Sequence, residues 1–223
     1  MANIENILIL LEEKKYANAR SLLLDMNAID LAEFMEELND EHVLMLYRLL
    51  PKDLAADVFS NMDPEMQEII IQSITDKEIS ELVELLFIDD TVDFIEELPA
   101  NVVKRVLRNA NPEKRRIINQ FLNYPEDSAG SIMTIEFMDL NKELTVGESI
   151  ERIRRIGIKK ETVNTCYVIG QNRYLEGEIT LKDLVMADDS TKIKEIMSTK
   201  EDLIFIATDT DVEDITNLFR KYS

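Results

Sequence analysis

Apolar residues recur at intervals of three and four positions between Ile4 and Leu122, which is the spacing that gathers side chains on one face of an α-helix. Helices of about 10–14 residues fit between the breaks in this pattern. Asp30 and Asp63 are predicted N-cap residues, and Pro64 suits a first helical turn. The recurring groups are Ile7, Leu10 and Leu11; Leu22, Leu23 and Met26; Leu31, Phe34 and Leu38; and Leu44, Leu46 and Leu49. The first half of the chain therefore predicts a series of short helices.

An internal repeat runs through this half. Leu50-Pro51 recurs as Leu98-Pro99, a shift of 48 positions (98 − 50). Each copy reads as a short helix opened by proline, a turn at Asn, and a second helix that starts at Pro-Glu. Units of this kind cannot bury their apolar faces alone, so they are expected to stack into a superhelix. A shared helix-turn-helix pattern would also produce the match. The same shift relates Val58 to Val106, Asn61 to Asn109, Pro64 to Pro112, Glu65 to Glu113, Ile69 to Ile117, Ile70 to Ile118 and Gln72 to Gln120.

The pattern changes after Thr134. Phe137–Leu140 reads as a short extended run, and Thr145 with Glu148 forms a capping-box signature that opens an amphipathic helix. Two strands, Thr165–Ile169 and Leu175–Ile179, follow as a predicted hairpin. Thr180 is the predicted cap of the next helix. The order is strand, helix, strand, strand, helix.

A second copy of this order begins near Lys192–Met197, with Leu203–Ile206 as its predicted first strand. The acids of Asp209–Asp214 cap a helix that runs to Tyr222. The hairpin and final helix of this copy are missing, which would leave Ile215, Leu218 and Phe219 poorly covered. A truncated chain, or a partner chain that covers this surface, is the expectation.

Composition narrows the function. Forty-five acidic against 25 basic residues give a formal net charge of −20, which disfavours nucleic acid as a partner. A well-solvated acidic surface explains this charge, and so does a surface whose self-repulsion is relieved by bound cations. No apolar run approaches the roughly 18 residues of a membrane span, and no secretory signal is predicted. Cys166 is the single cysteine, and His42, the single histidine, is distant in sequence. No catalytic triad or phosphate loop appears, so an enzyme is not expected.

One acidic stripe stands out. Asp89, Asp93 and Glu97 are four residues apart and share one face of a predicted helix. Like charges at this spacing destabilise an isolated helix by a few tenths of a kcal/mol per pair. On spacing alone, a solvated outer face is the favoured interpretation. The alternative is half of a magnesium site, because Mg²⁺ takes oxygen ligands and commonly one or two carboxylates.

The junction at Tyr124–Thr134 carries a resemblance. Its Pro-Glu-Asp-Ser-Ala-Gly-Ser-Ile-Met-Thr resembles the segment that joins the two cytosolic domains of the MgtE family of magnesium channels and transporters. The acidic run Asp89–Asp93 with Leu98-Pro99, and the later Leu181–Leu184 and Ala207–Asp211, are similar to elements of the same family. The resemblance covers nearly the whole chain in order.

The resemblance implies a mainly α fold with an α/β domain after it. It implies a right-handed α-helical superhelix over residues 1–124, a hinge over 125–134, a first CBS motif over 135–197, and the start of an incomplete second CBS motif over 198–223. It also implies magnesium ligands at Asp57, Asp89 and Asp93 in the helical half, although the family often has Glu at the place of Asp57. A backbone oxygen near Gly130–Ser131 is implied, assigned here to Ser131. Asp211 and Glu213 are the implied ligands from the second CBS motif. A further family carboxylate falls at Ser223, which is not acidic.

The implied function is the cytosolic Mg²⁺-sensing region of a magnesium transporter, in which the two domains close when Mg²⁺ binds and separate when it leaves. Its own transmembrane domain and a second copy joined through the CBS domains are the implied partners, at the cytoplasmic face of the membrane. The alternative is a soluble helical scaffold with a CBS module that binds ATP or another adenine nucleotide. The resemblance points to Thr180, Lys182 and Asp183 for that nucleotide, and an ordinary helix cap explains the same residues.

Overall fold

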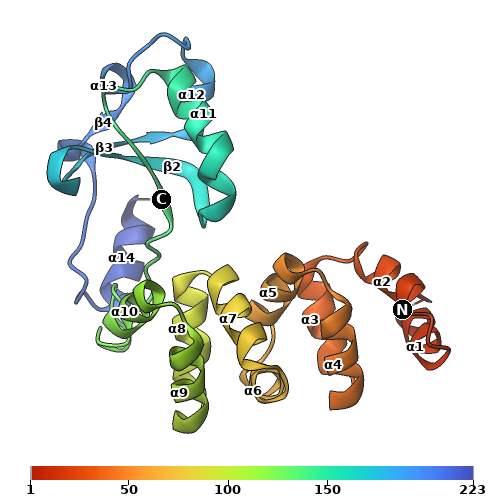
Figure 1. Ribbon diagram of the computed structural model, residues 1–223. Coiled ribbons are helices and arrows are strands. Elements are labelled where there is room, and N and C mark those ends of the chain that lie inside the picture. The colour runs from red at the N-terminus through yellow and green to blue at the C-terminus, as the bar shows by residue number, and fades with distance from the viewer. Residues whose placement is uncertain (1, 223) are drawn as a thin grey trace. The chain divides into compact units, whose positions relative to one another are not determined.

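The structure is a computed structural model that describes residues 2–222. The chain divides into two compact units, and the division falls between Asn123 and Tyr124. The first unit contains only helices among its described elements, and the second contains a small sheet with helices (Figure 1). A mainly helical fold followed by an α/β domain is confirmed.

The helical unit has a regular period of 12 residues. From α3 to α10, each helix begins 12 residues after the one before it, at positions 28, 40, 52, 64, 76, 88, 100 and 112. The repeat at 48 residues therefore spans four helices. The helices are α1 (Ala2–Glu12), α2 (Tyr16–Leu23), α3 (Ala28–Glu36), α4 (Asp40–Leu49), α5 (Lys52–Ser60), α6 (Pro64–Ser73), α7 (Asp76–Leu85), α8 (Ile88–Glu96), α9 (Ala100–Asn109) and α10 (Pro112–Phe121).

The period follows from which positions are buried. One apolar side chain in the second turn of every helix from α3 to α10 lies in the core, so each helix presents the same face to its neighbours. Burial of such a side chain stabilises the fold by about 1.5–3 kcal/mol. Helices α3, α5, α7 and α9 contact one another in succession, while α4 contacts α6 and α8 contacts α10. The stacking expected from the sequence is confirmed. The side chains are Phe34, Leu46, Val58, Ile70, Leu82, Phe94, Val106 and Ile118.

Helix caps explain where these helices start. Asp63 accepts a hydrogen bond from the backbone N–H of Met66 at 2.8 Å, and Pro64 stands in the first turn, as predicted. The prediction for Asp30 is wrong. Asn27 is the N-cap of α3, and it accepts from the N–H of Asp30 at 2.8 Å. Both residue types cap helices well, and the residue with extended backbone dihedral angles takes the role.

The second unit contains a four-stranded sheet in the order β1-β2-β3-β4. β1 (Phe137–Leu140) pairs in parallel with β2 (Thr162–Ile169), β2 pairs antiparallel with β3 (Leu175–Thr180), and β3 pairs antiparallel with β4 (Ser198–Thr199). The helical elements are α11 (Val146–Ile156), η1 (Gly157–Lys159), η2 (Gln171–Arg173), α12 (Leu181–Met186), α13 (Ile193–Ile196), η3 (Lys200–Asp202) and α14 (Val212–Tyr222). The order β1-α11-β2-β3-α12 is that of a CBS motif.

The predicted local signals of this unit are mostly confirmed. Thr145 and Thr180 each form a complete capping box, at the starts of α11 and α12. Cys166 is fully buried in β2, and burial raises the pKa of its thiol to about 11. It is a packed apolar residue, as expected. The core of the unit consists of Met138, Leu140, Val146, Cys166, Val168, Ile179, Leu184 and Ile193.

The prediction of a strand at Leu203–Ile206 is wrong, because no strand of the described chain pairs with this segment. An extended apolar run becomes a strand only where a partner accepts its ladder of hydrogen bonds. The expected exposure of α14 is partly wrong: Ile215 is 6% exposed, whereas Phe219 is 69% exposed. The first turn of α14 covers Ile215, and the later turns reach past that cover.

The segment after α10 pairs with the segment before α14, both within the second unit. Ser128 and Asp211 form an antiparallel bridge. The N–H of Ala129 donates to the carbonyl oxygen of Thr210 at 2.8 Å, and the N–H of Gly130 donates to that of Thr208 at 2.7 Å. The proposed hinge residues are therefore anchored to the start of α14.

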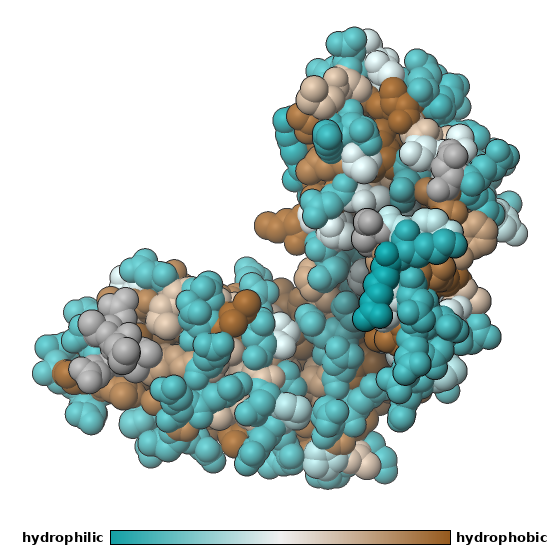
Figure 2. Space-filling view, turned by 180° about the vertical axis from the view of Figure 1, so that it is seen from behind, coloured by the Kyte–Doolittle hydropathy of each residue, from teal (hydrophilic) through white to brown (hydrophobic). Residues whose placement is uncertain are grey.

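Hydrophilic residues cover most of the visible surface, with smaller hydrophobic patches between them (Figure 2). Within residues 2–222, none of the helices combines the length and the apolar character that a membrane crossing requires.

Candidate cation-binding carboxylates

Helix α8 carries the acidic stripe that the sequence singles out. Ile88, Val92 and Ile95 point into the core, and this leaves Asp89 and Asp93 on the other side of the helix. The N-cap residue, Phe87, has no side chain that can accept a hydrogen bond. Acidic groups in the first turn stabilise the helix dipole instead. The aromatic rings of Phe94 and Phe59 meet edge to face at 5.2 Å and bring α8 against α5.

Asp89 has an unusual carboxylate. Its Oδ1 atom is buried and accepts no hydrogen bond within the described chain. A buried carboxylate oxygen without a donor loses its water and gains nothing in return, which costs about 1–3 kcal/mol or more. A cation bound to this oxygen would compensate that loss. The structure therefore fits the residue type and place that the magnesium hypothesis requires.

Asp57 on α5 and Asp93 on α8 share a second property. Partial burial raises the pKa of both carboxyl groups, and a neighbouring acid raises each further, Asp53 beside Asp57 and Asp89 beside Asp93. Both effects penalise the charged form. A divalent cation relieves both, because it replaces lost water and neutralises the neighbouring charge.

A cavity of about 300 Å³ adjoins this surface. Asp90 and Asp93 line it together with Glu96 and Glu97, and Ser60 and Gln67 lie opposite on α5 and α6. Gln67 is buried and donates from Nε2 to the carbonyl oxygen of Phe59 at 2.9 Å. The cavity thus has a neutral polar wall and an acidic wall.

The candidate residues of the second unit are more exposed and make local hydrogen bonds. Asp211 accepts at Oδ1 from the N–H of Glu213 at 2.8 Å, and this leaves its second oxygen outward. Glu213 is exposed in the first turn of α14. Ser131 donates from Oγ to the carbonyl oxygen of Ser128 at 2.9 Å. Ser223 lies outside the described residues.

The candidate nucleotide residues lie together at the start of α12. The hydroxyl of Thr180 donates to Asp183 Oδ2 at 2.6 Å and accepts from the N–H of Asp183 at 3.1 Å. These hydrogen bonds lower the pKa of Asp183. Lys182 is exposed beside them. Thr180 and Asp183 thus have a structural role in this chain, and Lys182 projects into solvent.

Among residues 2–222, no three or more Asp, Glu, His or Cys side chains come together as a metal cluster. Two residues near the candidates were missed by sequence reasoning, Asp53 and Asp90. The 12-residue period could have shown Asp53, because it places Asp53 and Asp57 on α5 at the positions of Asp89 and Asp93 on α8.

Stacked 12-residue helices followed by a CBS motif define the class of protein, a helical-repeat domain joined to a CBS domain. The comparisons with known proteins agree. The sequence profile of the MgtE intracellular N domain matches residues 26–127. The chain is 32% identical to a magnesium transporter MgtE of Thermus thermophilus over 216 residues, 95% of this chain and 47% of that protein. It is 23% identical to one of Bacillus subtilis over 98% of this chain and 48% of that protein.

Two solved structures share the fold. The cytosolic domain of the Mg²⁺ channel MgtE in complex with ATP aligns with a TM-score of 0.88 at 30% identity, over 98% of this chain and 89% of that one. The soluble part of a magnesium transporter aligns with a TM-score of 0.91 at 24% identity, over 99% and 86%. The chain belongs to the MgtE family. It spans about half the length of the curated relatives it matches, which are named as transporters and not as enzymes.

Proposed function

We propose that this chain is the Mg²⁺-sensing regulatory region of a magnesium transporter. The observation that carries the proposal is the buried, unpartnered Oδ1 of Asp89, beside Asp93, whose pKa is raised. Asp57 has the same electrostatic setting on α5. Oxygen ligands in this number suit Mg²⁺, which keeps several waters and takes one or two carboxylates.

The proposed mechanism is electrostatic. Asp57, Asp89 and Asp93 of the helical unit, the backbone oxygen at Ser131, and Asp211 and Glu213 of the CBS unit supply oxygens to shared ions. Without Mg²⁺ the acidic residues repel one another and favour separated units. With Mg²⁺ the ions favour a closed arrangement, and the shift equals the difference in Mg²⁺ affinity between the two states. In the intact transporter, closure would reduce transport.

Thermal unfolding in chelator and in Mg²⁺ tests this function. At 100 times the dissociation constant, a bound ion stabilises the folded protein by about 2.7 kcal/mol. Replacing Asp89 and Asp93 together by Asn should remove most of this gain. Glu33→Gln is the matched control, because Glu33 is exposed on α3 at the repeat position that Asp57 and Asp93 occupy. A full Mg²⁺ shift in the double variant would refute the site, and X-ray scattering profiles unchanged by Mg²⁺ would refute the closure.

The family relationship also suggests location and partners. The chain would lie at the cytoplasmic face of the membrane, attached to its own transmembrane domain. A homodimer through the CBS units is the proposed assembly. Val185 and Met186 on α12 support it, because they are 67% and 79% exposed and need cover. Light scattering of the wild type and of Val185→Ser checks the dimer.

A second candidate function is binding of an adenine nucleotide by the CBS unit. It is favoured by the similarity, at 30% identity, to a cytosolic domain solved in complex with ATP. Thr180, Lys182 and Asp183 would contact the ribose and phosphates. Isothermal calorimetry with ATP tests this function, and absence of heat would refute it.

A further inference from the structure

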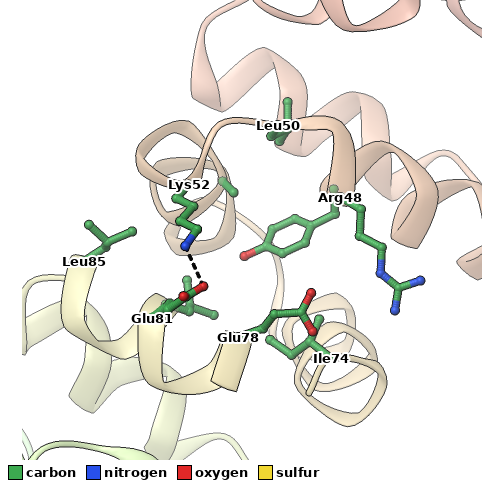
Figure 3. A pocket seen from close by; sticks show the side chains of 10 residues that line it. Arg48, Leu50, Lys52, Ile74, Glu78, Glu81 and Leu85 are labelled. Atoms are coloured by element: carbon green, nitrogen blue, oxygen red, sulfur yellow. Dashed lines mark ion pairs between the residues drawn. The ribbon is translucent and has the colours of Figure 1, made fainter. Parts of the chain in front are cut away.

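A second cavity lies within the helical unit, on the turn between α4 and α5. It has a volume of about 380 Å³ and is lined from α4, α5 and α7 (Figure 3). Leu50, Ala55 and Leu82 form an apolar floor, and Leu85, which is 39% exposed, lies at its edge. The volume falls in the range of ligand-binding pockets.

Tyr47 lines this cavity with a side chain that is only 8% exposed. Its hydroxyl makes no hydrogen bond within the described chain, whereas most buried tyrosine hydroxyls find a partner. Burial, together with the nearby charge of Glu78, raises the pKa of Tyr47. The hydroxyl therefore stays protonated at any physiological pH. It is a buried donor that lacks an acceptor.

The charged groups around the cavity are already satisfied. Lys52 and Glu81 form an ion pair at 2.8 Å (Figure 3). Glu78 accepts from both the N–H and the hydroxyl of Thr75 at 2.7 Å, as the acid of a capping box. A ligand with a net charge would have to break these contacts. A neutral acceptor, such as the carbonyl oxygen of an amide, fits the free donor without doing so.

The apolar surface continues beyond Arg48. A neighbouring cavity of about 430 Å³ is lined by Tyr16, Leu44, Met45 and Leu49 and shares Arg48 with the first. The guanidinium of Arg48 makes one long hydrogen bond, at 3.4 Å, to the carbonyl oxygen of Ser73, so it keeps donors for a second group. Two apolar clefts with donors between them match an extended peptide, which has a carbonyl between apolar side chains.

We propose that these two clefts bind an uncharged apolar peptide segment of a partner protein. One apolar side chain of the peptide occupies the cleft over Leu82, and another occupies the cleft over Leu44. A peptide carbonyl oxygen between them accepts from the hydroxyl of Tyr47 and from Arg48. The site lies apart from the acidic stripe of α8 and does not rest on the proposed magnesium function.

The test uses the full chain, labelled with ¹⁵N, and the probe acetyl-Leu-Ala-Leu-amide. We expect amide shifts at residues of both clefts, in chelator as well as in Mg²⁺. Tyr47→Phe keeps the ring and should weaken binding by about fivefold, the loss of one hydrogen bond. Leu85→Ser should weaken it similarly. The matched control is Leu24→Ser, which removes an exposed leucine (44% exposed) from outside both clefts.

Three results would overturn the proposal. The first is no shift at the solubility limit of the probe. The second is equal affinity of the wild type and Tyr47→Phe, since the hydroxyl would then make no contact. The third is equal affinity for acetyl-leucinamide with no shift at Leu44, Met45 or Leu49, which would indicate a small-molecule pocket. Tyr47→Phe removes no packed atom besides the hydroxyl oxygen, so an unchanged melting temperature separates lost binding from lost folding.

Discussion

Asp57 on α5 and Asp93 on α8 occupy the same position of the 12-residue repeat, because 93 − 57 is 36, three helix periods. Each has an acid four residues before it, Asp53 or Asp89, which raises its pKa further. The same electrostatic conflict therefore appears twice on the helical unit. Such a conflict costs stability in the absence of a cation, and its repetition suggests that an ion relieves it.

The first prediction concerns stability without magnesium. Asp93→Asn should raise the free energy of unfolding in chelator by a few tenths of a kcal/mol, since it removes one like-charge pair on a helix. Urea denaturation with EDTA measures this. Glu33→Gln, at the same repeat position on α3, should change stability less, because the residue four before it is Ile29. A destabilised Asp93→Asn variant would contradict the account.

The second prediction concerns pH. Asp57 and Asp93 have folded-state pKa values raised above the ordinary 3.8, so the folded state binds their protons more tightly than the unfolded state. Their effect on stability is absent below pH 3.8 and becomes increasingly unfavourable as pH rises through the raised values. The melting temperature of Asp57→Asn/Asp93→Asn minus that of the wild type, in EDTA, should grow from pH 3 to 6 and then stay constant. A difference that shrinks with pH would refute the sign.

The third prediction concerns Arg105, which ties α9 to the turn between α6 and α7. Its guanidinium donates to the carbonyl oxygens of Ile71 and Ile74, both at 2.7 Å, and to Asp76 Oδ1 at 2.8 Å. Arg105→Gln should destabilise the protein by about 1–3 kcal/mol through the two main-chain bonds. The exposed neighbour Lys104 is the control, and Lys104→Gln should stay within about 0.5 kcal/mol of the wild type in urea denaturation.

The fourth prediction concerns Gly130. A Cβ atom there would lie 2.5 Å from the ring of Tyr124 and 2.9 Å from the carbonyl oxygen of Thr208. Gly130→Ala should therefore weaken the pairing with residues 208–211, at a cost of about 1–3 kcal/mol. Hydrogen exchange at Ala129 and Val212 measures the pairing. Gly147→Ala is the control, because its Cβ would meet Asp189 at an ordinary 3.4 Å. Equal protection in both variants would contradict the prediction.

The fifth prediction separates folding from nucleotide binding at α12. Thr180→Ala removes the capping hydroxyl and should cost about 1 kcal/mol. Lys182→Gln should leave stability unchanged, because Lys182 is exposed, and should weaken ATP binding if the nucleotide contacts this helix. Calorimetry with ATP and thermal melts measure both quantities. Unchanged ATP affinity in Lys182→Gln would remove that residue from the site.

Sequence reasoning found the residues whose partners are close along the chain. The capping boxes at Thr145 and Thr180 join residues three apart, so the letters predict them. The choice between Asn27 and Asp30 failed for the opposite reason, since both are good caps and only the backbone conformation separates them. The strand predicted at Leu203–Ile206 failed because its type depended on a ladder partner elsewhere.

The candidate site shows the same division. Spacing placed Asp89, Asp93 and Glu97 on one helical face, but spacing favoured a solvated surface. The unpartnered Oδ1 of Asp89 became visible only in three dimensions, because burial depends on neighbours from other helices. Asp53 was overlooked because a period of 12 is hard to see until the helix boundaries are known.

By itself, the sequence determined the order of helices and strands, most of their caps, the acidic character and the family, because these depend on local hydrogen bonds, periodicity and recognisable motifs. Only the tertiary structure decided which side chains lose water. It paired residues 128–130 with 208–211, and it left Asp89 and Tyr47 with polar atoms that lack partners. The physical reason is that burial and hydrogen bonding join residues far apart in sequence, whose meeting depends on the packing of the whole unit.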